Sequence, residues 1–385
     1  MMIKRTLNID NFKQSMFLFG PRQVGKTYLI KNSISYDLYI DLLESRQYLA
    51  YFKDPSLLSR EIAALSKKNC RVIIDEIQRC PDLLNEVQLN IDNRGDAIQF
   101  ILTGSSARKL RRGGTNLLGG RAIRLNLYPC TSEELGLLFN LDEVLKYGSI
   151  PKIILEGEEQ NKNRELHSYV DLYLKEEIQQ ESLTRNIPAF AKFLELAGHE
   201  NGNILNFNNI SREVGVHSKT IKDYYNILED TLLGFMLYPF SRSHRERLIS
   251  HPKFYLFDLG VANALRGEGM PETNKISPAY GRAFEHFIIL EVKRLLDYRE
   301  REVKMSFFRT SDGAEVDLIL EFGRDEVWAV EIKSSSQPQL NSLRGLRSFI
   351  KDHKVSKAIC ACKSMRPYKD QEIDFLPWQD FLAQL

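Results

Sequence analysis

The sequence lacks an excess of charge of either sign. Its 385 residues carry 53 Lys and Arg against 51 Asp and Glu, which gives a net charge of +2. This balance excludes a strong global field that would attract a polyanion, so any basic binding surface must be local. With 43% hydrophobic and 27% charged residues, the composition excludes a disordered or collagen-like chain and predicts about two to four globular domains.

Cysteine is scarce, and its spacing excludes a zinc site or a disulfide framework. Of the five cysteines, Cys360 and Cys362 are close enough to bind a metal together, but their apolar surroundings favour a strand with incidental sulfur. Long hydrophobic runs are also absent, because the longest, Leu232–Phe240, is far shorter than a membrane span. Since the first residues lack the apolar centre of a signal peptide, we expect a cytoplasmic protein with no membrane partner.

Residues 15–129 contain short β-branched and aromatic runs that alternate with helical stretches. This alternation is typical of an α/β domain with a parallel sheet. The predicted strands are Met16–Gly20, Leu38–Leu43, Arg71–Asp75, Gln99–Thr103 and Ile123–Tyr128.

The segment Gly20–Thr27 matches G-x-x-x-x-G-K-[ST], and it lies between an apolar strand and a helical run. Backbone N–H groups of such a loop surround phosphates, Lys26 neutralises the charge of the β- and γ-phosphates, and Thr27 coordinates Mg²⁺ at a helix N-terminus. ATP and Mg²⁺ are therefore the expected ligands. The residues expected to bind ATP are Gly20, Pro21, Arg22, Gln23, Val24, Gly25, Lys26 and Thr27.

Acidic and hydroxyl residues follow two later strands of the same predicted sheet. Asp75 and Glu76 end an apolar run, so we expect Asp75 to hold Mg²⁺ with Thr27 and Glu76 to polarise the attacking water. Thr103 ends the next strand within Thr-Gly-Ser-Ser, where it can sense the γ-phosphate or simply form a turn. Arg121 and Arg124 are candidates for the arginine that stabilises charge in the same site or in that of a neighbour.

These motifs, with Asp-Glu-Ile-Gln at 75–78 and Gly-Gly-Arg at 119–121, resemble a large bacterial and archaeal family of AAA-type ATPases. That family joins the ATPase to a C-terminal domain of unknown function, and the resemblance covers nearly the whole chain. It implies an AAA+-like sheet in which strand 38–43 lies between the phosphate-loop strand and the Asp75 strand. The sequence departs from the family at Lys175–Glu177, where an Arg-Asp pair is expected, so no arginine role is assigned there.

Residues 210–240 have the apolar spacing of a helix-turn-helix, with Gly215 at the turn and a strand predicted within Leu232–Pro239. The segments Val214–Val216 and Thr220–Tyr224 resemble the same family. The second helix, Ser218–Glu229, offers Lys and acidic side chains together, so DNA binding stays open. A basic stretch follows, made of Arg242, His244, Arg245 and Arg247.

In the last third, three segments match the order of a PD-(D/E)xK nuclease core: a helix with Glu285, a strand with Asp317, and a strand with Glu331 and Lys333. Strand alternation places Glu331 and Lys333 on one face. Glu285, Asp317 and Glu331 are the expected Mg²⁺ ligands, and Lys333 would orient water or stabilise the charge on phosphate. Two alternatives stay open: a surface ion pair without catalytic meaning, and a nuclease-like fold that only binds.

The predicted fold class is α/β, with an AAA+-like P-loop ATPase at 1–135, a helical connector or lid at 136–205, a winged helix-turn-helix at 206–250 and a nuclease-like domain at 251–385. We expect an ATPase whose nucleotide cycle controls a DNA-interacting, Mg²⁺-dependent nuclease region. The alternative is a nucleotide-switched module that binds DNA or protein through an inactive nuclease-like fold. DNA as a partner, cleavage and assembly into a homo-oligomer are open at this point.

Overall fold

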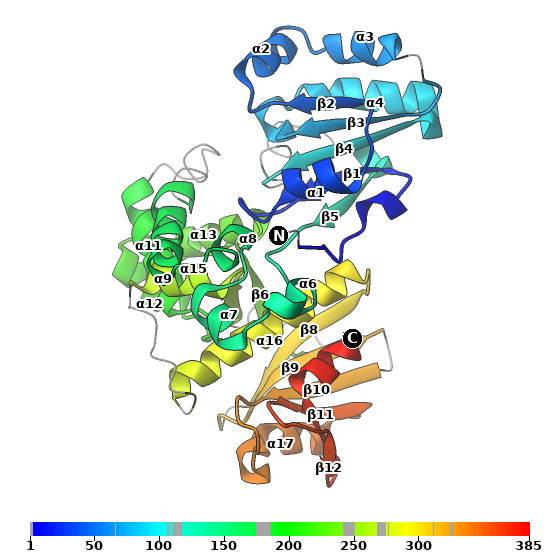
Figure 1. Ribbon diagram of the computed structural model, residues 1–385. Helices are drawn as coiled ribbons and strands as arrows, with labels where there is room; N and C mark the ends of the chain where they lie inside the picture. The colour runs from blue at the N-terminus through cyan, green and yellow to red at the C-terminus, as the bar shows by residue number, and fades with distance from the viewer. Residues whose placement is uncertain are drawn as a thin grey trace. The chain divides into compact units, whose positions relative to one another are not determined.

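The computed structural model describes residues 3–65, 67–105, 108, 110, 118–174, 186–241, 251–267, 275, 277–310, 312–323 and 326–385 (Figure 1). The chain divides into two compact units, Met1–Cys130 with Ile227–Leu233, and Thr131–Asn226 with Gly234–Leu385. Several positions singled out above lie outside the described residues, namely Ser106, Lys175–Glu177, Arg242, His244, Arg245 and Arg247.

The first unit is built on a parallel sheet of five strands in the order β2-β3-β4-β1-β5. These strands confirm the five predicted ones to within one or two residues at most ends. Their bounds are β1 Ser15–Phe19, β2 Leu38–Asp41, β3 Cys70–Asp75, β4 Ile98–Gly104 and β5 Ala122–Asn126. A strand order and loop–helix pattern of this kind are consistent with a P-loop NTPase.

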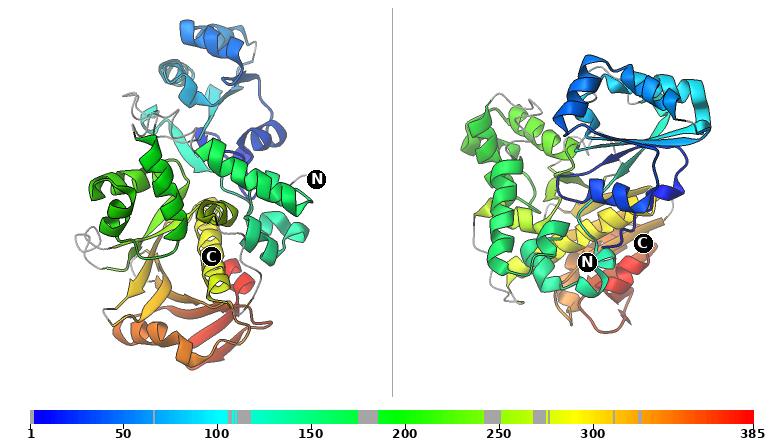
Figure 2. Two further views of the ribbon diagram at one scale, coloured as in Figure 1. Left: turned by 90° about the vertical axis from the view of Figure 1, so that its left-hand side faces the viewer. Right: turned by 45° about the horizontal axis from the view of Figure 1, so that its top comes forward.

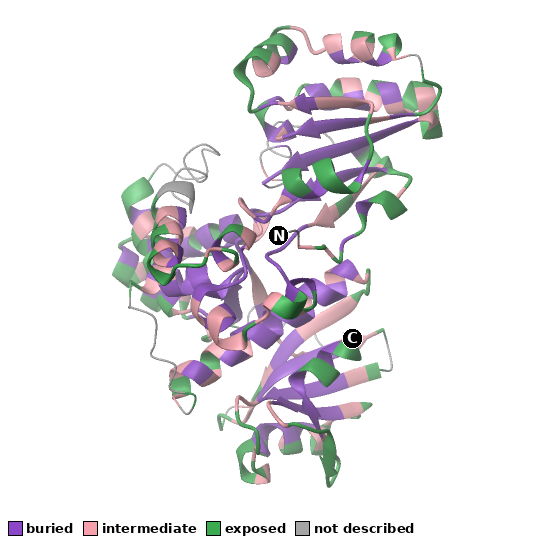
Figure 3. Cartoon of the chain, in the orientation of Figure 1, coloured by how far each residue is buried: buried purple, intermediate pink, exposed green. Residues whose placement is uncertain are grey.

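The expected position of β2 is wrong. The strand between β1 and β3 is β4, and β2 lies at the edge beside β3. The burial of the strands explains this order, because every residue of β1 and β4 is buried, whereas in β2 only Ile40 is. A continuous buried run belongs in the middle of a sheet covered on both faces, as Figure 3 shows for these strands.

Helices cover both faces of this sheet (Figures 1 and 2). On one face, side chains of α2 Ser45–Lys53, α3 Leu57–Ala64 and α4 Leu83–Arg94 pack with the strands in one apolar core that includes Phe19, Ile74, Phe100 and Leu102. The helix α1, Lys26–Ser33, lies on the other face and begins directly after the loop that follows β1. Short 3-10 turns complete the unit at Ile9–Asn11, Ile77–Arg79, Gly95–Ala97 and Leu118–Gly120.

The second unit begins with helices. Among the described residues from 131 to 199 there is no strand. The helical elements are α6 Ser132–Leu135, the 3-10 turn Gly136–Leu138, α7 Leu141–Tyr147, α8 Pro151–Ile154, α9 Glu159–Ser168, the π-helical turn Tyr169–Leu174 and α11 Ile187–His199.

Two helices and a strand pair follow. Helix α12, Phe207–Val214, ends at Gly215, whose φ of +82° is the left-handed conformation that glycine adopts at low cost. Helix α13, Ser218–Asp230, leads to β6 Gly234–Pro239, which pairs antiparallel with β7 Lys253–Leu256. Because β6 also pairs with β8 at Tyr238 and Ser306, these two strands belong to the large C-terminal sheet.

That sheet has eight strands in the order β12-β13-β11-β10-β9-β8-β6-β7. The sequence pattern of this region predicts strands at Lys253–Asp258, Met305–Arg309, Ala314–Glu321, Val327–Lys333 and Val355–Ala361 and a helix at Arg282–Leu296. They are present as β7, β8 Val303–Arg309, β9 Glu315–Phe322, β10 Glu326–Ile332, β11 Lys357–Cys362 and α16 Pro278–Tyr298. The remaining elements were not predicted. They are β12 Tyr368–Asp370, β13 Ile373–Pro377, α15 Leu259–Arg266, the 3-10 turn Leu340–Leu343, α17 Arg344–Asp352 and α18 Trp378–Ala383. A search of the described residues finds no helix with the length and apolarity of a membrane span.

Candidate functional site

The loop from Gly20 to Lys26 turns sharply between β1 and α1. A Cβ atom on Gly20 would lie 2.3 Å from the carbonyl oxygen of Leu127, so the close approach of two backbones requires glycine there. Gly25 has φ +95° and Gln23 has φ +64°. A positive φ is costly for a residue with a side chain, and such strain is typical of ligand-binding loops. Pro21 and Val24 are buried in the loop, and Arg22 is partly exposed.

The Lys26 side chain is buried and crosses the inside of this loop. Its Nζ donates hydrogen bonds to the carbonyl oxygens of Gly20 at 2.6 Å and Pro21 at 3.1 Å. Arg5, which the sequence analysis missed, supports the loop from outside through bonds to the carbonyl oxygens of Val24 at 2.7 Å and Tyr128 at 2.6 Å. The loop is therefore held in shape by two cations, one of which lies where phosphate charge is expected.

The Asp75 carboxylate accepts hydrogen bonds from three hydroxyl groups. Thr27 Oγ1 donates to Oδ2 at 2.8 Å, Tyr39 OH donates to the same oxygen at 2.7 Å, and Thr103 Oγ1 donates to Oδ1. Asp75 is buried, so these donors compensate its charge. The structure thus brings together the three predicted residues Thr27, Asp75 and Thr103, each from a different element.

Tyr39 was not predicted as part of the site. Burial and the hydrogen bond to Asp75 raise the pKa of this tyrosine, so it stays a protonated donor. The signal available in the sequence was strand alternation, which places Tyr39 and Asp41 on one face of the predicted strand. The register that pairs Asp41 with Asp75 is seen only in the structure. Its ring also lies 4.5 Å from Lys31 Nζ.

Glu76 lies beside this group in a strained backbone conformation, with φ +62° and ψ +47°. Its N–H donates to Thr103 Oγ1 at 3.0 Å, and its carboxylate accepts a bond from Gln78 Nε2. Gln78 is buried against β4, since a Cβ atom on Gly104 would lie 2.5 Å from Gln78 Oε1. The predicted Glu76 is thus fixed next to Asp75, at the carboxyl edge of the sheet where the loop also lies.

The structure does not bring Arg121 to this edge. Arg121 immediately precedes β5, and in the register of the sheet the first residue of β5 pairs with Ser15, the first residue of β1. The phosphate loop follows the other end of β1, about 15 Å away at 3.3 Å per residue. Arg121 instead forms a two-bond ion pair with Asp92, at 2.5 and 3.2 Å. A role for Arg121 in the site of its own chain is therefore wrong, because strand direction separates the two.

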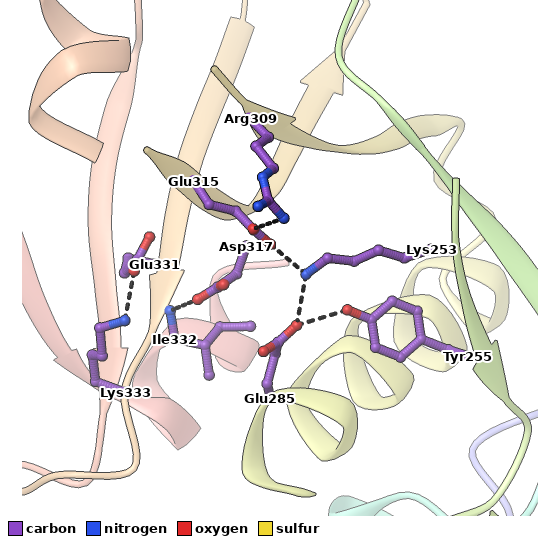
Figure 4. Close-up of polar contacts among 9 residues, drawn as sticks. All are labelled: Lys253, Tyr255, Glu285, Arg309, Glu315, Asp317, Glu331, Ile332 and Lys333. Atoms are coloured by element: carbon purple, nitrogen blue, oxygen red, sulfur yellow. Dashed lines mark hydrogen bonds and ion pairs between the residues drawn. The ribbon is translucent and has the colours of Figure 1, made fainter. Parts of the chain in front are cut away.

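A second group of charged side chains lies in the C-terminal sheet (Figure 4). Val330 of β10 pairs with Leu318 of β9, so Glu331 and Asp317 occupy the next positions on neighbouring strands. Both are buried. Asp317 Oδ2 accepts a hydrogen bond from the N–H of Ile332 at 2.8 Å. Lys333 Nζ bonds Glu331 Oε1 at 2.6 Å, whereas Glu331 Oε2 is buried with no partner among the described residues.

The titration of these groups reflects an excess of buried negative charge. Burial raises the pKa of Asp317 well above its usual range, and the carboxylates of Glu331 and Glu285 raise it further. Burial also raises the pKa of Glu331, although Lys333 opposes this effect. Burial alone would lower the pKa of Lys333, but the two carboxylates outweigh it and raise the pKa. A cation would relieve this repulsion.

Glu285, which was expected to bind Mg²⁺ with Asp317 and Glu331, contacts Tyr255 and Lys253 in the structure. Its Oε1 accepts a hydrogen bond from Tyr255 OH at 2.7 Å and lies 3.2 Å from Lys253 Nζ. Lys253 also bonds Glu315 Oε1 at 2.6 Å. Lys253, Tyr255 and Glu315 were not assigned roles, although alternation within β7 places Lys253 and Tyr255 on one face.

Within the part of the chain that the structure describes, no group of three or more His, Cys, Asp and Glu side chains is assembled around a single metal position. The hard oxygen donors Asp317 and Glu331 still suit Mg²⁺ chemically, and the unpartnered Glu331 oxygen offers a ligand. Mg²⁺ binding by Asp317, Glu331 and Glu285 stays a prediction.

The helix-turn-helix offers exposed side chains of both signs on α13. Lys219, Lys222 and Asp223 are all exposed, and Lys222 Nζ lies 5.3 Å from the ring centre of Phe207. Phosphate contacts need cations, whereas Asp223 repels phosphate. DNA binding by this segment therefore stays a prediction.

Comparison with known proteins gives matches along most of the chain. Residues 13–136 match the family described as "AAA domain", and residues 138–272 and 280–381 match two families described as domains of unknown function, DUF8612 and DUF4143. The N-terminal part is thus an AAA-type ATPase domain, which confirms that part of the resemblance. These matches do not address the winged helix or the nuclease-like core.

Among curated proteins, the chain is similar to an uncharacterized protein of Mycobacterium tuberculosis, with 25% identity over 345 residues that cover 89% of this chain and 75% of the relative. It is 24% identical to an uncharacterized protein of Methanocaldococcus jannaschii, over 88% of this chain and 79% of that protein. A solved structure of a DNA polymerase III gamma subunit-related protein from Thermotoga maritima matches 61% of this chain and 94% of its own, at 13% identity and a TM-score of 0.22.

Proposed function

We propose that this protein binds ATP with Mg²⁺ at the loop Gly20–Thr27, hydrolyses it, and uses the nucleotide state to control a Mg²⁺-dependent nuclease site in its C-terminal unit. The ATPase part is supported by one observation above all. Three hydroxyls converge on the buried Asp75, and one of them belongs to Thr27, the residue that follows the loop lysine. This is the arrangement in which a P-loop protein holds Mg²⁺ beside the phosphates.

Each residue of the ATPase site has a distinct task in this proposal. Lys26 exchanges its bonds to the loop carbonyl groups for bonds to the phosphates. Thr27 and Asp75 would hold Mg²⁺, which neutralises phosphate charge when bound. Glu76, fixed by Gln78, orients and polarises the attacking water, and Thr103 holds both acidic residues in position.

Nucleotide binding and ATP turnover test this part directly. Lys26→Ala should abolish both, whereas Glu76→Gln should bind ATP and fail to turn it over. Matched controls are Lys53→Ala and Glu44→Gln, which change exposed residues of the same unit. Normal turnover by the Glu76→Gln protein would contradict the role of Glu76.

The nuclease part is supported by the uncompensated charge of the C-terminal group. Asp317 and Glu331 are buried neighbours with raised pKa values, and one Glu331 oxygen has no partner among the described residues. These two carboxylates would hold Mg²⁺, which activates a water for attack on a phosphodiester when bound. Lys333, next to Glu331, would stabilise the charge that develops on the phosphate.

A second candidate function is a nucleotide-switched module that binds DNA or protein without cleaving. The contacts of Lys253 favour it, because this ammonium already compensates Glu285 and Glu315. Asp317 accepts a hydrogen bond from the backbone N–H of Ile332, and such a bond is also typical of a carboxylate with a structural role.

A cleavage assay separates the two candidates. The protein is incubated with supercoiled and with single-stranded DNA, with Mg²⁺ or Mn²⁺, and with or without ATP. Nicking that is lost in Asp317→Ala and Lys333→Ala, but kept in the surface control Lys304→Ala, supports the nuclease. Its absence, with ATP turnover present in the same sample, supports the binding module.

A further inference from the structure

A buried lysine from the edge strand of the C-terminal sheet lies among four carboxylates, which we call the acidic group. These are Glu285, Glu315, Asp317 and Glu331. Lys253 begins β7, and its side chain is only 6% exposed. Its Nζ lies 2.6 Å from Glu315 Oε1 and 3.2 Å from Glu285 Oε1 (Figure 4). Tyr255, two residues later in the same strand, donates to the same Glu285 oxygen at 2.7 Å. One strand thus supplies both a charge and a hydrogen bond to the acidic group.

The acidic group therefore has two halves that differ in charge balance. In the first half, Glu285 and Glu315 share the Lys253 ammonium, and Arg309 approaches Glu315 from the exposed side at 3.5 Å. In the second half, the described residues contribute one ion pair, between Lys333 and Glu331, and the charge of Lys253 also reaches Asp317 without a direct contact. Lys333 bonds one Glu331 oxygen and leaves the other without a partner.

Distances decide where a divalent ion can bind. Such an ion needs carboxylate oxygens at about 2.0–2.6 Å, and it is repelled by a neighbouring ammonium. Between Glu285 and Glu315 the ammonium of Lys253 already occupies the position that bridges the two carboxylates. Between Asp317 and Glu331 no cation bridges the two carboxylates among the described contacts, because Lys333 bonds Glu331 and Asp317 accepts a backbone N–H.

We propose that Lys253 is a built-in cation of this site, so that the acidic group takes one divalent metal ion, at Asp317 and Glu331, and not the pair of ions that its four carboxylates suggest. The inference rests on the proposed metal-dependent site. Glu285 is then a positioning residue held by Lys253 and Tyr255, and not a metal ligand.

The number of bound ions tests this inference. The full chain is prepared without nucleotide and with the N-terminal metal ligands removed by Thr27→Val and Asp75→Asn, and bound Mn²⁺ is counted from the loss of the free-ion electron paramagnetic resonance signal. One ion per chain, lost in Asp317→Asn, is the expected result. Two ions would overturn the role of Lys253 and leave the nuclease proposal intact. No bound ion would overturn this inference together with the nuclease proposal, while ATP turnover by the wild-type chain would still be measured separately.

Removal of the lysine gives the converse result. In the same background, Lys253→Met should bind two Mn²⁺ ions, because Glu285 and Glu315 lose their cation. Lys304→Met, which removes a partly exposed lysine paired with Glu321 in the same sheet, should still bind one. If the methionine variant does not fold, Lys253→Gln removes the charge and keeps a hydrogen-bond donor. A single ion in a folded Lys253 variant would contradict the proposal.

Discussion

Removal of one hydroxyl group, by Tyr39→Phe, should change how the ATPase depends on Mg²⁺. Tyr39 OH donates at 2.7 Å to Asp75 Oδ2, the same oxygen that accepts from Thr27. Without this bond Asp75 keeps two donors but can rotate about its side-chain bond. The carboxylate that would hold Mg²⁺ is then less well positioned before the ion arrives.

The size of the effect follows from the kind of bond that is lost. A hydrogen bond to a charged group contributes about 1.5–3 kcal/mol. Loss of a residue that orients a metal ligand typically weakens metal binding about 10–100-fold. Since Thr27 and Thr103 still hold Asp75, we expect the lower end, about a tenfold rise in the Mg²⁺ concentration for half-maximal turnover, or about 1.4 kcal/mol.

The assay is steady-state ATP turnover at saturating ATP, titrated with free Mg²⁺. The turnover rate should recover at high Mg²⁺, and ATP binding in the absence of Mg²⁺ should be unchanged. Tyr36→Phe is the matched control, because Tyr36 is 40% exposed and its ring lies 5.5 Å from that of Tyr39. An unchanged Mg²⁺ dependence would refute the reasoning, and so would a loss of turnover that Mg²⁺ cannot restore.

Three further substitutions test other parts of the structure. Arg121→Ala should lower the unfolding free energy by at most about 1 kcal/mol, because the ion pair of Arg121 with Asp92 is exposed. ATP turnover of the dilute chain should not fall. A fall would place this arginine in the site. Gly345→Ala should destabilise the C-terminal unit by about 3 kcal/mol in thermal unfolding, since the new Cβ would lie 1.8 Å from the Glu315 carbonyl oxygen, whereas Gly281→Ala, with 3.8 Å of space, should not. Burial raises the pKa of Glu291, so its contribution to stability is full below its unfolded pKa of about 4.3 and is lost as pH rises through the folded pKa. Denaturant titrations between pH 4 and 7 should therefore show a smaller loss of stability in Glu291→Gln, and an identical pH profile would count against the assigned shift.

The features that the sequence predicted best are local in the chain. The loop Gly20–Thr27 is contiguous, so its composition was sufficient to predict its conformation and its helix. The five strands of the first unit were visible because each is a short apolar run between helical stretches. The same reasoning found Glu331 and Lys333, which lie two residues apart at the end of β10.

The features that it did not predict depend on contacts between distant segments. The position of β4 between β1 and β3 depends on which strands are buried on both faces of the sheet. Helical stretches separate these strands along the chain, so their order in the sheet cannot be read from the sequence. Arg121 was assigned from its place after two glycines, but strand direction puts it at the opposite edge of the sheet. Arg5 contacts Tyr128, which is 123 residues away, so no local pattern could indicate the bond.

In both sites a side chain from another strand decides what a motif carboxylate can do. Tyr39 of β2 gives Asp75 a hydrogen bond but no charge, so the negative charge of Asp75 stays available for a cation. Lys253 of β7 places a full positive charge beside Glu285 and Glu315, so the negative charge of these two carboxylates is already compensated. A hydroxyl donor thus prepares a carboxylate for metal binding, whereas an ammonium that bridges two carboxylates takes the place of the metal. The same distinction confines the expected ion of the C-terminal unit to Asp317 and Glu331, and it makes the count of bound ions a test of side-chain chemistry and not of fold.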